Sequence, residues 1–178
     1  MATTLTQTSY RFRNDDGDEA GASWLAAENT APTIYAHKNY RARFLVTESG
    51  GTAWTAGTAS LYYSTDGSNF SAAGANTPIQ AAGSKWYANG VSSTEQITSA
   101  GTFSAVNTGM INDAVSGTVT ISASEEAEIE FCFQVKHGGN DISDGDTLYL
   151  AVYNDTTALD AYTNDASFTL RLPGGRRG

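Results

Sequence analysis

The strongest constraint on the fold is a run in the C-terminal half in which apolar and polar side chains alternate without interruption. The run spans 126–135, with Ala127, Ile129, Phe131, Phe133 and Val135 at every second position. Successive side chains of a β-strand point to opposite faces of the sheet, so all five apolar side chains share one face. A slip of one residue would bury the glutamates between them. We therefore expect a central strand of fixed register with a polar outer face, flanked by a strand over 147–153.

The same period of two recurs along the chain. The other segments expected to form half-buried strands are 7–13, 39–47, 59–64, 117–122, 147–153 and 167–172. In 39–47, Arg41 and Arg43 fall opposite Phe44 and Val46, as in a strand with one solvated face. Seven to nine strands joined by turn residues predict an all-β fold, an antiparallel two-sheet sandwich of immunoglobulin-like type with short helices or none.

Turn residues and irregular stretches divide these strands. Asp66-Gly67 lies between two aromatic-flanked runs and predicts a hairpin, because glycine supplies the positive φ of a tight turn. Asp144-Gly145-Asp146 has similar turn chemistry. Residues 71–116 are expected to be the least regular part of the chain, and 20–29 shows a weak pattern for a short helical turn. We expect a single domain over 1–172 with an N-terminal arm, and a flexible basic tail over 173–178.

Charge and cysteine content exclude several classes of protein. The 178 residues carry a net charge of −9, which disfavours nucleic acid as a partner because phosphates are repelled. The single cysteine, Cys132, excludes a scaffold held by intramolecular disulfides. The N-terminus lacks a signal-peptide pattern and no stretch is apolar enough for a membrane helix. We expect synthesis and retention in a reducing cytoplasm until assembly or release, and no membrane partner.

Candidate chemical sites are few. The acidic run Asp15–Glu19 could hold a calcium ion, but it lacks the EF-hand spacing, and solvated turns are the commoner reading of such a run. His37 and His137 stand far apart and are expected at the surface. Cys132 is expected to be a small structural residue of its strand. No catalytic motif is present, so the sequence predicts neither an enzyme nor a cofactor or metal site.

Two further features leave alternatives open. Most aromatic side chains alternate inward with aliphatic ones, but Tyr62, Tyr149 and Tyr153 fall on the opposite faces of their strands. These three could form an exposed platform for sugars. The C-terminal residues Arg171, Arg176 and Arg177 form a basic tail on an acidic chain, either a disordered end or an electrostatic arm to an acidic neighbour.

Several blocks of the sequence resemble a family of β-rich virion proteins of tailed bacteriophages. The most specific blocks are 8–19 and 22–30, and shorter ones follow in the same order at 39–44, 61–64, 128–134, 144–146 and 158–163. The resemblance covers nearly the whole chain and carries no catalytic residue over.

The resemblance implies a head decoration protein on the outer capsid surface, with an immunoglobulin-like sandwich as its body. Its partners would be the major capsid protein and further copies of itself, in trimers or other clusters at lattice symmetry axes. The expected capsid or neighbour contacts are in the two terminal segments, namely Ala2, Thr3, Thr4, Leu5, Thr6, Arg171, Arg176 and Arg177. The alternative is a module of a phage fibre or tail that binds glycans or another part of the host surface.

Overall fold

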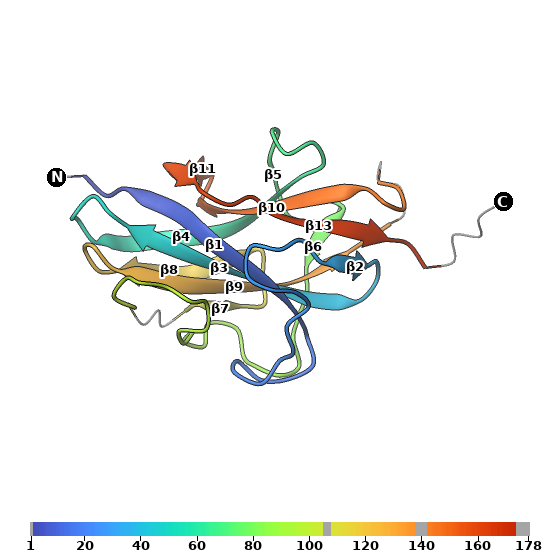
Figure 1. Ribbon diagram of the computed structural model, residues 1–178, viewed down its shortest axis with the longest axis horizontal. Helices are drawn as coiled ribbons and strands as arrows, with labels where there is room; N and C mark the ends of the chain where they lie inside the picture. The colour runs from blue at the N-terminus through green and yellow to red at the C-terminus, as the bar shows by residue number, and fades with distance from the viewer. Residues whose placement is uncertain (1, 105–107, 138–141, 174–178) are drawn as a thin grey trace.

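The computed structural model describes residues 2–104, 108–137 and 142–173 and shows two β-sheets packed face to face (Figure 1). The strands are β1 (Leu5–Asn14), β2 (Thr33–Tyr35), β3 (Asn39–Glu48), β4 (Trp54–Ser64), β5 (Ser71–Ala72), β6 (Ile79–Ala81), β7 (Met110–Ile111), β8 (Val115–Ile121), β9 (Glu126–Val135), β10 (Thr147–Asn154), β11 (Thr157–Ala158), β12 (Ala161–Tyr162) and β13 (Ala166–Arg171). The predicted all-β sandwich is confirmed.

The first sheet, sheet A, has the strand order β12-β1-β3-β9-β6, with β7 also paired to β9. The second, sheet B, has the order β2-β13-β10-β4-β5, with β11 paired to β10 and β8 to β4. Three short pairings are parallel, namely β12 with β1, β2 with β13 and β7 with β9. The sheets are therefore mixed, and the prediction of wholly antiparallel sheets was wrong at these three pairs.

The described residues contain no helix, so the helical turn expected over 20–29 was also wrong. Turns and an isolated bridge between Arg13 and Trp24 occupy this stretch instead. Accordingly, the part of the chain that is described includes no helix with the length and apolarity to cross a bilayer.

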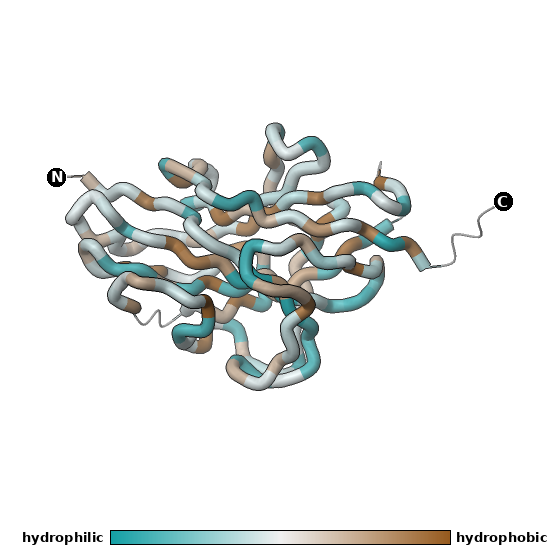
Figure 2. Tube along the Cα trace, in the orientation of Figure 1, coloured by the Kyte–Doolittle hydropathy of each residue, from teal (hydrophilic) through white to brown (hydrophobic). Residues whose placement is uncertain are grey.

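The inner faces of the two sheets form one apolar core. Phe12 and Phe133 of sheet A meet Phe168 of sheet B, with ring centroids 5.8 and 5.9 Å from that of Phe168. Leu148, Leu150 and other apolar side chains of sheet B also point inward and are buried. Figure 2 shows the apolar positions recurring along the strands of both sheets. The period of two thus assigned the inward-facing residues correctly.

Strand β9 lies inside sheet A, as expected for a central strand. It pairs with β3 from Thr47 opposite Glu126 to Asn39 opposite Gln134, and its other edge is shared by β6 and β7. The prediction that residues 147–153 flank it was wrong, because these residues form β10, which lies between β13 and β4 in sheet B. Alternation fixes the face of a side chain but not the neighbour of its strand, and β10 belongs to the other sheet.

The two predicted turns are present. Strands β4 and β5 form an antiparallel hairpin in which Gly67 has a φ of 76° and the Asp66 carboxylate accepts the N–H groups of Ser68 and Asn69. At the second turn, Gly145 has a φ of 93° and the Asp146 N–H donates to the Ser143 carbonyl at 3.1 Å. Asn140 and Asp141, which precede this turn, lie outside the described residues.

The irregular stretch predicted between 71 and 116 is present, and it forms a third layer. Residues 82–104, the covering segment, lie against the outer face of sheet A. Ala82 N–H donates to the carbonyl of Cys132 at 3.0 Å, and Ser104 N–H to that of Glu126 at 2.6 Å. Figure 1 shows this segment in green beside the blue loop after β1. Strand β9 is thereby covered on both faces, with only Gln134 half-buried.

Candidate functional site

A cluster of charged side chains lies buried between the outer face of sheet A and the loops that cover it. Its members, the ionic cluster, are Arg13 of β1, Arg41 and Arg43 of β3, and Glu128 and Glu130 of β9, and each is 0% exposed. The prediction of a solvated face for Arg41, Arg43 and the β9 glutamates was therefore wrong. Charges are removed from water here because each finds an opposite charge on a neighbouring strand or covering loop.

Arg43 is the centre of the ionic cluster. Its Nε lies 2.6 Å from Glu130 Oε2, and its Nη1 lies 2.6 Å from Glu128 Oε2. Its Nη2 reaches 2.6 Å to Glu19 Oε1 in the loop after β1, and its Nη1 also donates to the Thr94 carbonyl at 2.9 Å. Burial opposes the charge of Arg43, but Glu130 and Glu128 outweigh it and raise the pKa of the guanidinium. The Arg43 side chain thus links β3 to β9 and contacts both the loop after β1 and the covering segment.

The other two arginines, Arg13 and Arg41, also bind the loops that cover sheet A. Arg13 Nη2 lies 2.8 Å from Glu130 Oε2, and its Nη1 donates to Gln96 Oε1 at 2.9 Å. Arg41 pairs with Asp15 Oδ1 through Nη2 at 2.6 Å. Glu128 also accepts the backbone N–H groups of Gln96 and Ile97, each at 2.6 Å. The covering segment and the loop after β1, together the two covering loops, are therefore both held by charge-assisted hydrogen bonds, which are stronger than neutral ones.

The acidic run Asp15–Glu19, considered as a cation site, is part of this arrangement. Asp15 and Glu19 face the arginines, while Asp16 accepts the Ser23 N–H at 2.8 Å and Asp18 accepts the Gly21 N–H at 2.7 Å. These carboxylates are directed to separate partners. The described residues include no group of three or more His, Cys, Asp or Glu side chains placed to hold a metal ion.

The ionic cluster can position loops, and its members are occupied with one another. Among the described residues, two buried polar atoms in its neighbourhood have no hydrogen-bond partner, Arg13 Nε and Tyr87 Oη. Tyr87 lies against the Arg41 guanidinium, 4.7 Å from ring centroid to Cζ, and burial raises the pKa of its phenol. Burial likewise raises the pKa of Cys132 to about 12, so its thiol stays protonated. The Tyr87 phenol and the Cys132 thiol therefore both stay protonated near pH 7.

The residues predicted to contact a capsid lie at several places. Ala2 is exposed, but the Thr4 N–H donates to Glu48 Oε1 at 3.1 Å and Leu5 is buried opposite Glu48. Thr3 and Thr6 are half-buried. From Leu5 onward this segment belongs to sheet A, where backbone pairing with β3 holds Leu5 and Thr6, and the residues before Leu5 precede the strand.

At the other terminus, Arg171 is exposed and its Nη1 lies 3.2 Å from Asp144 Oδ2. Arg176 and Arg177 lie outside the described residues. His37 and His137 are exposed, as predicted. Of the terminal candidates that the structure describes, none contacts the ionic cluster.

The three tyrosines predicted to face away from the core are half-buried on the outer face of sheet B. Tyr62 and Tyr153 stack on each other, with ring centroids 3.8 Å apart and planes 7° apart. Phe70 lies beside them, 6.3 Å from the Tyr153 centroid. Stacking covers one face of each of the paired rings, which leaves less ring surface for a ligand than a row of separate tyrosines would.

Comparison with models of known protein families finds no match, and comparison with curated proteins finds none either.

Glu19→Gln tests whether the loop after β1 is held by charge. Burial acts to raise the pKa of Glu19, but the Thr94 N–H and the Arg43 guanidinium together lower it. A carboxylate with a lowered folded-state pKa adds stability above its unfolded pKa, near 4.3, and loses it as pH falls through the folded value. We expect Glu19→Gln to cost about 1.5–3 kcal/mol at pH 7.

The deficit of Glu19→Gln should shrink as pH falls below about 4.3, because the wild-type carboxyl then becomes neutral too. Thermal melts followed by circular dichroism between pH 7 and pH 3 measure it. Glu95→Gln is the matched control, since Glu95 is an exposed carboxylate of the covering segment. An equal deficit at both ends of the pH range would show that the Glu19 charge does not hold the loop.

Proposed function

We propose that this chain is a non-enzymatic structural protein of a phage virion, a decoration protein that binds the outer capsid surface and stabilises the shell. The observation that carries the proposal is the ionic cluster, which fixes two long loops on the outer face of sheet A. A buried ion pair is costly to desolvate and is a poor source of net stability, but it can specify one conformation. A surface that must fit a repeating lattice benefits from such a fixed shape.

The resemblance to tailed-phage virion proteins supports the same proposal. Its most specific block, 8–19, contains Arg13 of the ionic cluster and the loop residues Asp15 and Glu19 that face it. The later blocks 39–44 and 128–134 contain the other four members. The similar residues are thus those that hold the covering loops, as a shared immunoglobulin-like body with a shared loop layer would require.

Binding would use side chains that the rigid body presents to a neighbour. Trp86 of the covering segment is 42% exposed, and its Nε1 donates to the Asp15 carbonyl at 3.0 Å. Val91 of the same segment is 41% exposed. Together with Ala2 and Arg171 at the terminal segments, these residues offer apolar and charged contacts to the major capsid protein or to another copy. Many weak contacts repeated over a shell sum to tight attachment.

Quantitative mass spectrometry of intact virions tests the proposal. We expect the chain in a fixed ratio to the major capsid protein and at many copies per particle, and we expect Trp86→Ala to lower that occupancy. The melting temperature separates a folding defect from a binding defect. It should hardly change in Trp86→Ala, because Trp86 is exposed. Absence from purified virions, or a few copies per particle, would overturn the decoration role.

A second candidate is a glycan-binding or host-surface-binding module of a phage fibre or tail. The observation that favours it is the half-exposed aromatic group of Tyr62, Tyr153 and Phe70 on the outer face of sheet B. A low copy number in virions together with binding to a glycan array that Tyr62→Ala abolishes would favour this role over decoration.

A further inference from the structure

The covering segment makes a tight turn at 88–91, and the two central residues of this turn are Asn89 and Gly90. Gly90 has a φ of 80°, the left-handed conformation that glycine adopts at the third position of a type II turn. Across the turn, the Val91 N–H donates to the Ala88 carbonyl at 3.4 Å. Asn89 is exposed, and it is the only asparagine of the sequence that a glycine follows. The turn thus presents the single Asn-Gly pair of the chain to solvent.

An Asn-Gly pair can modify itself without an enzyme. The backbone nitrogen of Gly90 attacks Cγ of Asn89, a C–N bond forms, and the side-chain nitrogen leaves as ammonia with the proton of the Gly90 amide. Water then opens the resulting succinimide at either carbonyl and gives aspartate or isoaspartate. Glycine favours the attack because it has no Cβ to hinder the approach and because its backbone is freer than that of other residues.

In the closed structure both reacting groups are occupied at strand β7 and the residue after it. The Gly90 N–H donates to the Met110 carbonyl at 2.8 Å, and Asn89 Oδ1 accepts the Asn112 N–H at 2.8 Å. The Met110 N–H in turn donates to the Val91 carbonyl at 2.9 Å. Met110 is fully buried, and its strand pairs with β9. Ring closure therefore requires the turn to leave β7, which is a local opening of the covering segment.

Three Asp-Gly pairs could form the same ring, but the structure disfavours it there. These pairs are Asp16-Gly17, Asp66-Gly67 and Asp144-Gly145. An ionised carboxylate is a poorer electrophile than a carboxamide because it carries negative charge. Hydrogen bonds from Asn69 lower the pKa of the Asp66 carboxyl, and the Ser23 hydroxyl lowers that of Asp16. The Asp144 carboxylate is held in an ion pair at 3.2 Å. All three carboxylates are thus kept in the less reactive form.

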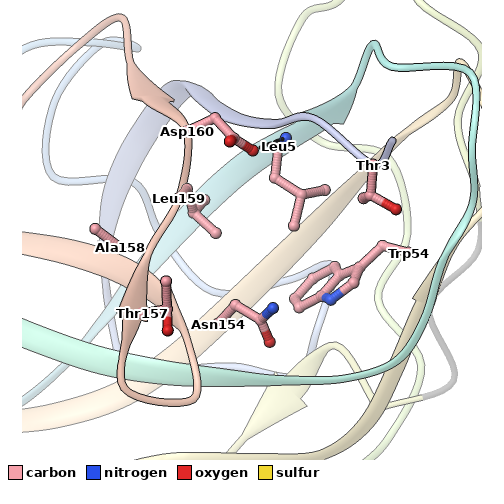
Figure 3. A pocket seen from close by; sticks show the side chains of 8 residues that line it. All are labelled: Thr3, Leu5, Trp54, Asn154, Thr157, Ala158, Leu159 and Asp160. Atoms are coloured by element: carbon pink, nitrogen blue, oxygen red, sulfur yellow. Dashed lines mark hydrogen bonds between the residues drawn. The ribbon is translucent and has the colours of Figure 1, made fainter. Parts of the chain in front are cut away.

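Asn154 is a suitable comparison among the other asparagines. It lies at the end of β10, where it lines a hollow of about 290 Å³ together with Leu5 and Trp54 (Figure 3). The next residue, Asp155, has a side chain that hinders attack by its backbone nitrogen. The Asp155 N–H also donates to the Thr58 carbonyl at 2.7 Å. We therefore expect Asn154 to react more slowly than Asn89.

We propose that Asn89 is a self-modification site, and that its conversion to isoaspartate is controlled by opening of the covering segment at β7. Isoaspartate routes the backbone through the former side chain, which adds a methylene to the turn. The longer turn no longer matches the spacing between Val91 and Met110, so a segment that has opened and reacted cannot close as before. Because Val91 is exposed, the reaction also alters the surface assigned to capsid contacts. Asn89 therefore limits how long the covering segment keeps its original shape.

The test follows the products at position 89 in the full chain. The native chain is incubated at mildly alkaline pH beside the same chain unfolded in guanidinium chloride, and both are analysed by chymotryptic peptide mapping with mass spectrometry. In the native chain we expect aspartate and isoaspartate at Asn89 before any product at Asn154 or at the three Asp-Gly pairs. The native chain should react more slowly than the unfolded chain, because opening precedes ring closure. Asn89→Gln is the blank, since its longer side chain closes a ring much more slowly.

Two variants test whether the covering segment controls the rate. Asn112→Ala removes the Nδ2 donor that binds the Tyr87 carbonyl at 2.9 Å, at a half-buried position outside the core. Arg43→Ala removes the bond to the Thr94 carbonyl of the covering segment. We expect the rate at Asn89 to rise at least about tenfold in Arg43→Ala, which corresponds to about 1.4 kcal/mol less opening free energy, and by a smaller factor in Asn112→Ala. Phe133→Ala is the control, because it weakens the core and should change the rate less than Arg43→Ala does.

Equal rates in the native and the unfolded chain would overturn the proposal, and so would a first product at any position other than Asn89. A rate that neither Arg43→Ala nor Asn112→Ala raises would show that the covering segment does not control the reaction. These measurements use the isolated chain, whereas the decoration role is tested on virions, so either proposal can fail without the other.

Discussion

Replacing Arg43 by alanine is expected to lower the free energy of unfolding by about 3–5 kcal/mol, the largest effect of a single charge removal in this protein. The variant leaves Glu128 and Glu130 without their closest guanidinium in a site that water does not reach. It also frees Glu19 and the Thr94 carbonyl, so both covering loops lose a contact. Urea unfolding followed by circular dichroism measures the change.

Arg171→Ala is the matched control for Arg43→Ala. Its partner Asp144 and Arg171 itself are both 45% exposed, and exposed ion pairs contribute only about 0–1 kcal/mol. Replacing Arg43 and Glu128 together by methionine separates the cost of unpaired charge from the loss of packing, because it removes an ion pair at once while Glu130 keeps the Arg13 guanidinium at 2.8 Å. We expect it to be more stable than Arg43→Ala. A loss below about 1 kcal/mol in Arg43→Ala would contradict the central place given to this side chain.

Replacing Phe133 by alanine is expected to cost about 3–5 kcal/mol through the loss of buried apolar surface and the cavity left behind. Phe133 is fully buried and its ring meets those of Phe12, Tyr40 and Phe168, with centroids 6.2, 6.4 and 5.9 Å away. It therefore joins sheet A to sheet B at the middle of the core. Its melting temperature should fall accordingly in calorimetry.

Phe70→Ala makes the same chemical change at a half-buried position of the outer face of sheet B. It should cost much less than Phe133→Ala, since Phe70 already meets water and, among the described residues, its ring contact is with Tyr153. Equal losses in the two variants would indicate that Phe133 is not the junction between the sheets.

The inner half of the fold could be predicted from sequence because one physical rule governs it. Apolar side chains at every second position must share a face and be buried, and Phe131 and Phe133 of β9 are buried as that rule requires. The Asp66-Gly67 hairpin was equally readable, since the positive φ of Gly67 is a local property. The partner of each strand is set by the whole chain, which is why β10 was assigned to the wrong sheet.

The outer face could not be predicted by the same rule, which takes charged residues to be solvated. Burial of Arg43 and Glu130 depends on their direct opposition across β3 and β9. It also depends on the covering segment, whose Thr94 lies 51 positions from Arg43 in the sequence. The sequence did contain one signal of this burial. Arg43 and Glu130 carry opposite charges on two predicted strands, and the long irregular stretch between those strands could cover them. The Asn89-Gly90 pair is visible in the sequence, but the hydrogen bonds that hold it beside β7 are not, because they join distant segments.

Cys132 gives this layered arrangement a built-in reporter. Its side chain is 0% exposed on the outer side of β9, its Cα lies opposite that of Arg41, and the Ala82 N–H of the covering segment donates to its carbonyl. With the pKa of the thiol raised to about 12 by burial, alkylation requires the outer layer to open. The rate at which a thiol reagent modifies the native chain therefore measures how often that layer detaches, separately from unfolding of the core.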